Sequence, residues 1–320
     1  MPVHVAGVHR GRLDGLSDSG PFALPFGGGM NAADFAIGDW ILSDGARIVR
    51  RLERKTLLRR SAAGSGQEQQ LIAANVDILF IVTSCNADFN PARLERYLAL
   101  AAEAGTEPVI LLTKADTSGE AETYCVKARK LQRDLAVVAL DARDPDAAAI
   151  LAPWCRAGQT VALVGSSGVG KTTLTNTLTG MAGATGPIRE SDARGRHTTT
   201  QRSMHALASG GWLIDTPGMR SLGLAGVSDG IDAVFAEVTD LIGQCRFRDC
   251  THQTEPGCAI RLAAAEGRLD EERLARWDKL KREDRFTSAT AAEARERHRR
   301  FGRQVRKSLT VKARNDGGKG

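Results

Sequence analysis

Short apolar runs, each ending at a polar or glycine-rich segment, recur through the middle of the chain. The clearest of them span residues 109–112, 160–164 and 212–214. Runs of this length bounded by turn residues are typical of buried strands in a parallel sheet. A helix start is expected at 173–178, soon after the second run. The pattern therefore predicts an α/β domain, which would bind ligands at the carboxyl ends of its strands.

The first seventy residues follow a different pattern. Short β-type pieces at 3–8, 39–42 and 47–52 are separated by glycine-rich turns, which predicts a small β-barrel. Residues 62–70 are small and polar, as in a linker. We therefore expect a β-barrel first and the α/β domain after it.

The C-terminal end is basic, and a helix is expected over 289–305. Residues 281–320 contain thirteen Lys or Arg against five Asp or Glu, a net charge of +8, while the whole chain carries +6. Such a surface attracts phosphates through counterion release, although a charge run can also be only a solvated helix face. Because Phe286 and Phe301 are the only aromatic residues of this tail, recognition of the backbone or shape of RNA is favoured over base reading.

Length and composition narrow the class of protein. A chain of 320 residues can form two or three domains with a substantial core. No uninterrupted apolar run reaches membrane-spanning length, and the N-terminus lacks the apolar segment of a signal peptide. We therefore expect a cytoplasmic protein without membrane contact, in which Cys85, Cys125 and Cys155 are reduced thiols.

A complete phosphate-binding loop follows the run at 160–164. Its sequence is Gly-Ser-Ser-Gly-Val-Gly-Lys-Thr, in which the glycines let backbone N–H groups curl around phosphates. We expect Lys171 to reach the β- and γ-phosphates and the Thr172 hydroxyl to bind Mg²⁺. A plain glycine-rich turn is the alternative, but the strand before and the helix after favour a nucleotide loop. The expected phosphate-contacting residues are Gly165, Ser166, Ser167, Gly168, Val169, Gly170, Lys171, Thr172 and Thr173.

The segment Thr113-Lys114-Ala115-Asp116 reads like a guanine-recognition motif at the end of the run 109–112. The Asp116 carboxylate can accept both N–H groups on the edge of guanine, a pair that adenine does not offer, and the Lys114 stem can pack over the base. The motif is weak alone, because a Lys/Asp pair at a strand end is often a solvated loop. It is also unusual in preceding the phosphate loop along the chain.

A third element supports both motifs. Asp215 ends the run 212–214 and is followed by a turn through Gly218. We expect Asp215 to hold the Mg²⁺ shell through water, and the Gly218 N–H to contact the γ-phosphate. The polar segment 195–200 is suited to a loop that closes on Mg²⁺ and γ-phosphate, although a plain surface loop is the simpler interpretation.

A cysteine and histidine cluster lies near residue 250. Its members are Cys245, Cys250, His252 and Cys258. Three thiolates and one imidazole are the ligand set of a closed, tetrahedral structural Zn²⁺ site. Redox chemistry is the alternative, but it is disfavoured because the cluster has no Cys-x-x-Cys pair. One zinc ion per chain is therefore expected to stabilise a small domain.

Together these motifs resemble the RsgA (YjeQ) family of circularly permuted GTPases, which act on the small ribosomal subunit. The resemblance extends from Gly38-Asp39-Trp40 and residues 73–77 to the cysteine cluster. In this family, as here, the guanine motif precedes the phosphate loop, switch I (residues 195–200) and switch II (residues 215–218). The resemblance implies an OB-like barrel over 1–70, a permuted GTPase domain over 71–225, and a mostly α-helical zinc domain with a basic tail over 226–320. Since family members carry an earlier strand before residue 8, the completeness of the barrel is left open.

The resemblance also implies a mechanism and partners. Met219 stands where many GTPases have a glutamine that orients the attacking water. In the family this role belongs to a switch I histidine, which matches His197, and contact of His197 with RNA or solvent alone is the alternative. Thr199 is expected to bind Mg²⁺, with Thr198 as the alternative. The family implies a monomer that binds GTP and GDP, contacts 16S-type rRNA, and hydrolyses GTP faster on the small subunit.

Two departures predict modest nucleotide affinity. Thr113 replaces the common asparagine of the guanine motif, a change that family members tolerate. The later loop that backs the base has Asp141-Ala142 in place of a Ser-Ala pair.

Two other functions fit part of the sequence. An RNA-binding scaffold with a vestigial nucleotide site would account for the basic tail and Met219, but the complete loop and Asp215 argue against it. An ATP-dependent phosphotransferase is compatible with the phosphate loop alone, and Asp116 disfavours it.

Overall fold

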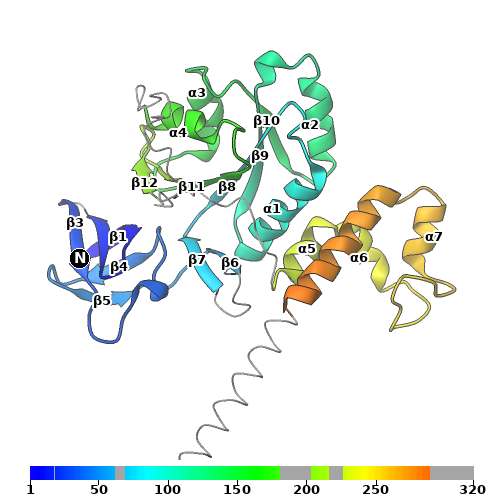
Figure 1. The fold of residues 1–320 in the computed structure, drawn as a ribbon, viewed down its shortest axis with the longest axis horizontal. Helices are drawn as coiled ribbons and strands as arrows, with labels where there is room; N and C mark the ends of the chain where they lie inside the picture. The colour runs from blue at the N-terminus through cyan, green and yellow to red at the C-terminus, as the bar shows by residue number, and fades with distance from the viewer. Residues whose placement is uncertain (18, 62–68, 181–202, 216–225, 289–320) are drawn as a thin grey trace, which may run out of the picture.

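A computed structural model describes residues 1–17, 19–61, 69–180, 203–215 and 226–288. Figure 1 shows a small β-sheet at the N-terminus, a central α/β part and a group of C-terminal helices. Among the described helices, none combines the length and apolar character needed to cross a bilayer.

The N-terminal part is one antiparallel sheet in the order β3-β2-β1-β4-β5. Its strands are β1 (Pro2–Val8), β2 (Arg12–Ser17), β3 (Gly20–Pro25), β4 (Trp40–Ser43) and β5 (Ile48–Arg51), with the short helix η1 (Ala32–Asp34) between β3 and β4. Val3, Leu13 and Ile41 are among the apolar residues of its core. The three predicted strands are present.

The sequence did not predict strands β2 and β3, because they contain residues that are usually unfavourable in strands. Gly15 lies within β2, where a Cβ atom would come 2.5 Å from a methyl group of Val3, so packing requires glycine there. Pro21 and Pro25 lie in β3, the outermost strand of the sheet, where the lack of an N–H donor costs least.

The central sheet has the order β10-β9-β8-β11-β13-β12, with β12 antiparallel to β13 and the other neighbours parallel. Its strands are β8 (Ile78–Ser84), β9 (Glu107–Thr113), β10 (Ala136–Ala139), β11 (Thr160–Gly165), β12 (Ser203–Ala206) and β13 (Trp212–Asp215). The three apolar runs are thus strands, as predicted. Because β9, β8, β11 and β13 are parallel, their carboxyl ends form one edge.

Helices pack on both faces of this sheet. One hydrophobic cluster includes α1 (Pro91–Ala104) and α2 (Ala121–Arg129), and the other includes α3 (Ala147–Leu151) and α4 (Lys171–Thr179). The short helices η2 (Ala115–Thr117) and η3 (Ala152–Trp154) lie in the connections. The helix start predicted near Thr173 is present as α4.

A two-stranded sheet, β6 (Leu57–Ser61) and β7 (Gln69–Ala74), connects the N-terminal and central parts. The linker predicted over 62–70 is therefore too long at its end, because Gln69 and Gln70 pair with β6. Gly38 has a φ of +89°, and a Cβ atom there would lie 2.1 Å from the carbonyl oxygen of Ala74. The Asn75 amide donates to the Gly38 carbonyl at 2.8 Å. The segments around 38 and 75 thus touch in space.

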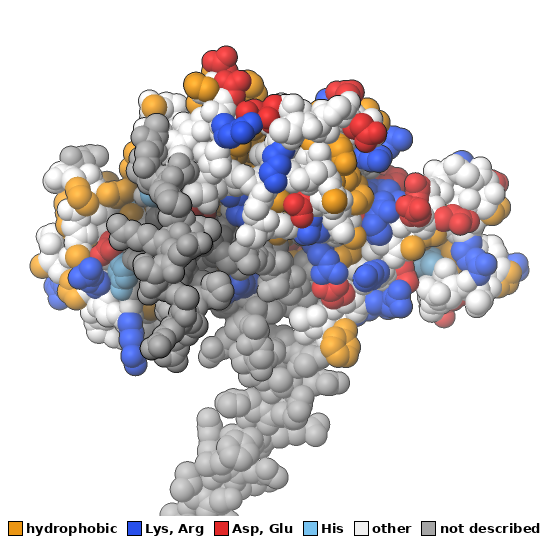
Figure 2. Space-filling view, turned by 45° about the horizontal axis from the view of Figure 1, so that its top comes forward, with side chains coloured by type: hydrophobic (Ala, Val, Ile, Leu, Met, Phe, Trp, Pro, Cys, Tyr) orange, Lys and Arg blue, Asp and Glu red, His pale blue; other side chains and the backbone are white. Residues whose placement is uncertain are grey.

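The C-terminal part contains α5 (Ser228–Val234), α6 (Ala236–Ile242), α7 (Ala259–Ala265) and a helix over residues 271–288. Glu95 of α1 is fully buried and accepts hydrogen bonds from Arg273 and Arg276 at 3.0–3.1 Å. Arg96 pairs with Glu283 beside them. Figure 2 shows Lys and Arg interspersed with Asp and Glu between the central part and these helices. Ion pairs therefore join the C-terminal helices to α1.

Candidate nucleotide site and metal centre

The predicted nucleotide residues meet at the carboxyl edge of the central sheet. Thr113 ends β9, Gly165 ends β11 and Asp215 ends β13. The order of these motifs along the chain does not affect their meeting, because each is placed by its own strand. Open α/β sheets bind ligands at this edge.

The backbone of the phosphate loop has the conformation that its glycines allow. Gly165 has a φ of +143°, and a Cβ atom there would lie 2.2 Å from the carbonyl oxygen of Val82. Gly168 and Gly170 have φ values of +79° and +92°. Val169 is fully buried between them, whereas Ser167 and Gly168 are exposed. The loop is thus anchored by one apolar side chain and presents its tip to solvent.

Charged and hydroxyl groups surround the loop. The Lys171 ammonium donates to the carbonyl oxygen of Gly165 at 2.8 Å and to that of Ser166. Thr172 is exposed at the start of α4, and Thr173 is half-buried. Burial raises the pKa of Asp215, while the charges of Lys171 and His205 oppose this rise. The sequence assigned Lys171 to the phosphates, and Thr172 and Asp215 to Mg²⁺. All three residues lie at the same edge of the sheet.

Thr113 links the guanine motif to the phosphate loop. Its buried hydroxyl oxygen lies 2.6 Å from the carbonyl oxygen of Val169 and 3.1 Å from that of Thr83. A hydroxyl has one proton to donate, and the shorter distance favours Val169. Thr113, which replaces the common asparagine, therefore links the guanine motif to the phosphate loop by a hydrogen bond.

The remaining residues of the guanine motif lie at the surface. Lys114 has a left-handed φ of 58° and is half-buried. The Asp116 carboxylate, on η2, accepts a hydrogen bond of 2.7 Å from Arg143. Arg143 also bonds Asp141, the residue that stands at the serine position of the loop after β10. Sequence reasoning missed Arg143, although the acidic Asp141 two residues earlier was a signal for a basic partner.

Several predicted residues lie outside the part of the chain that the structure describes. They are His197, Thr198, Thr199, Gly218 and Met219. Their catalytic and Mg²⁺-binding roles stay predictions. His205 of β12, whose charge acts on Asp215, was not singled out in the sequence.

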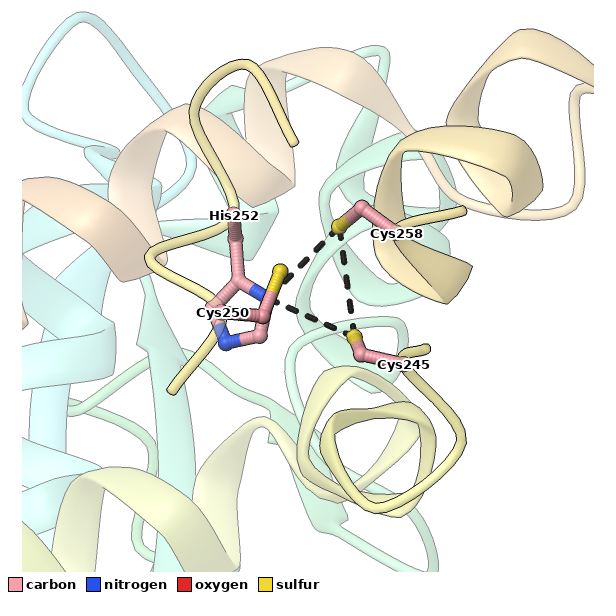
Figure 3. Close-up of side chains that lie close together, drawn as sticks. All are labelled: Cys245, Cys250, His252 and Cys258. Atoms are coloured by element: carbon pink, nitrogen blue, oxygen red, sulfur yellow. Dashed lines mark hydrogen bonds between the residues drawn. The ribbon is translucent and has the colours of Figure 1, made fainter. Parts of the chain in front are cut away.

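The predicted metal ligands form a compact cluster (Figure 3). One ligand atom from each of Cys245, Cys250, His252 and Cys258 lies within 4.8 Å of all the others. The His252 Nδ1 atom is 3.6 Å from the Cys245 and Cys258 sulfurs, which are 4.0 Å apart. Zinc bonds of about 2.3 Å to sulfur and 2.0–2.1 Å to nitrogen give tetrahedral edges of about 3.5–3.8 Å. The cluster can therefore hold a metal ion.

Local structure supports this cluster. His252 adopts a left-handed φ of 63°, and its ring lies 6.1 Å from the Trp277 ring of the long helix. The Glu255 carboxylate accepts from the backbone N–H groups of Thr251 and Gln253 at 2.8 and 3.1 Å. These bonds shape the loop that carries His252 toward the thiols.

Comparisons with known proteins agree with these motifs. The family model described as RsgA GTPase matches residues 51–225. A Mesorhizobium japonicum protein named "Small ribosomal subunit biogenesis GTPase RsgA" is 60% identical over 294 residues, covering 90% of this chain and 85% of its own. A Vibrio vulnificus relative, "Small ribosomal subunit biogenesis GTPase RsgA 2", is 49% identical over 93% of this chain and 85% of its own.

Two solved structures have a similar fold. The YjeQ structure from Thermotoga maritima matches with a TM-score of 0.63 at 22% identity, covering 87% of this chain and 96% of its own. YloQ, described as a circularly permuted GTPase, matches with a TM-score of 0.61 at 22% identity, covering 92% and 95%.

Proposed function

The chain belongs to the RsgA GTPase family, and from this premise we propose that it hydrolyses GTP during late maturation of the small ribosomal subunit. The observation that carries the proposal is the single sheet edge at which the phosphate loop, Asp215 and the guanine motif meet. The hydroxyl of Thr113 connects two of these motifs directly. Relatives at 60% and 49% identity are named for the same activity.

The site residues have distinct roles in this proposal. Asp116 accepts the two N–H groups of guanine, and Lys114 packs over the base. The phosphate loop and Lys171 bind the β- and γ-phosphates. Mg²⁺ is held by Thr172 and Thr199, with Asp215 acting through water. Bound Mg²⁺ neutralises charge that develops on the phosphates.

His197 orients the attacking water, because Met219 cannot hydrogen-bond to it. Switch I binds rRNA only while the γ-phosphate is present, so hydrolysis releases the subunit. The working unit is a cytoplasmic monomer divided into a barrel over 1–70, a GTPase domain over 71–225 and a metal domain over 226–320. The basic tail, together with the barrel, supplies contacts to 16S-type rRNA.

The metal in the cluster is Zn²⁺, a role that the Cys₃His donor set and the near-tetrahedral spacing support. All ligand positions come from the protein, so the ion stabilises the C-terminal fold. Metal analysis of freshly purified, unchelated protein should give about one equivalent of zinc per chain. Less than about half an equivalent would contradict the assignment.

GTP turnover with and without purified small subunits tests the main proposal. We expect the subunit to raise turnover at least about tenfold, and an unchanged rate would overturn the ribosomal role. Asp116→Asn should lose the preference for guanine, whereas an ATP-dependent enzyme would not respond. His197→Ala should bind GTP but lose the stimulated turnover.

A further inference from the structure

Arg143 bridges the two loops that form the base-binding end of the proposed nucleotide site. Its guanidinium bonds Asp116 at 2.7 Å and both oxygens of Asp141 at 3.1 Å. Its backbone N–H also donates to Asp141 at 2.9 Å. One planar cation thus connects the loop after β9 with the loop after β10.

The second loop is itself fixed to the phosphate side of the site. The Thr177 hydroxyl of α4 donates to the Ala142 carbonyl at 2.8 Å, and Ala142 is buried. The Leu140 N–H donates to the Leu112 carbonyl at 3.0 Å, just before the guanine motif. Arg143 therefore extends from a loop that is hydrogen-bonded to both α4 and β9, and its guanidinium holds the Asp116 carboxylate.

Folding stability does not account for this arrangement. The side chains of Arg143 and Asp116 are 68% and 32% exposed, and ion pairs of this kind contribute little to stability. The pair instead fixes the orientation of the Asp116 carboxylate, because a carboxylate that is held at one oxygen cannot rotate freely. Each carboxylate oxygen has two lone pairs, so Asp116 can accept from Arg143 and from guanine together.

We infer that Arg143 is a specificity-positioning residue, which fixes the Asp116 carboxylate so that it can accept both the N1–H and the 2-amino group of guanine. This inference rests on the proposed binding of GTP. Asp141 is the anchor of Arg143, and it takes the place of the serine that the sequence lacks at this point.

Inosine diphosphate provides a direct test, because hypoxanthine keeps N1–H and lacks the 2-amino group. Dissociation constants for GDP and IDP are measured on the full chain. Arg143→Ala should reduce the preference for GDP over IDP by at least about threefold, since part of a charged hydrogen bond is lost. Arg143→Lys should recover only part of it, because an ammonium lacks the planar fork. The matched control is Arg129→Ala, which removes another exposed pair, with Glu122.

A double-mutant cycle separates positioning from general loop damage. In an Asp116→Ala background, Arg143→Ala should leave the GDP-to-IDP ratio unchanged. The inference is overturned if Arg143→Ala leaves the ratio of the otherwise unmodified chain unaltered, tightens GDP, or lowers the ratio equally in both backgrounds. If the unmodified chain binds neither nucleotide, the proposed function fails and the inference fails with it. Normal GDP binding with an unaltered ratio removes only the role of Arg143.

Discussion

The central part is joined to its two neighbours by different kinds of contact. At the N-terminal junction, His4 of β1 stacks on Trp40 with ring centroids 4.3 Å apart and meets the edge of Trp212 at 5.5 Å. At the C-terminal junction, buried Glu95 accepts from Arg273 and Arg276. The first junction depends on close packing and reaches β13, which ends at Asp215. The second, built on α1, combines apolar packing against α5 with this buried cluster of charges. Stability at the two junctions should therefore respond to different perturbations.

Removal of Glu95 should have the largest effect. Burial raises the pKa of this carboxyl, while Arg276 and Arg273 oppose the rise. Glu95→Ala leaves two partly buried guanidinium groups without their shared carboxylate, which should lower the free energy of unfolding by about 4 kcal/mol. Denaturant unfolding measures the change. Glu122→Ala, at an exposed pair with Arg129, is the control and should stay within about 0.5 kcal/mol of the unmodified chain. Equal losses would contradict the importance of burial.

A substitution at Gly38 tests the packed junction. Gly38→Ala combines a φ of +89° with a Cβ atom 2.1 Å from the Ala74 carbonyl oxygen, so we expect a loss of about 3 kcal/mol. Gly45→Ala is the matched control, because Gly45 has a φ of +99° and open space around it. It should cost only the backbone strain, about 1 kcal/mol. Similar losses in thermal or denaturant unfolding would show that the contact with Ala74 is unimportant.

The sequence predicted the local elements of the fold better than the contacts at these junctions. The strands at 109–112, 160–164 and 212–214 were predictable, because each is a local apolar run with a motif at its end. The cysteine cluster was predictable from ligand type and spacing. The approach of Gly38 to Ala74 was not, because it joins residues far apart in the chain and leaves no local pattern.

The proposed base-binding end of the site was predictable only in part. Asp116 followed from its motif at a strand end, but the bond from Arg143 depends on how two separate loops fold. Glu95 was not singled out in the sequence, because its partners Arg273 and Arg276 come from a helix far along the chain. Long-range pairing of charges cannot be derived from periodicity.

Acid pH tests the packed junction through His4, with the smallest expected change in the free energy of unfolding. Burial lowers the pKa of His4 to about 4, from 6.5. The folded state favours the neutral imidazole of His4. The stability that depends on this neutral form is therefore fully present above pH 6.5 and is lost as the pH falls toward 4. Between pH 7 and pH 5, the loss should be about 2 kcal/mol larger in the unmodified chain than in His4→Phe, which keeps an aromatic ring against Trp40. Denaturant unfolding at both pH values measures the difference. Parallel pH profiles for the two proteins would mean that protonation of His4 does not destabilise the fold. The control is His9→Gln, which changes the histidine between β1 and β2, at a half-exposed pair with Asp14.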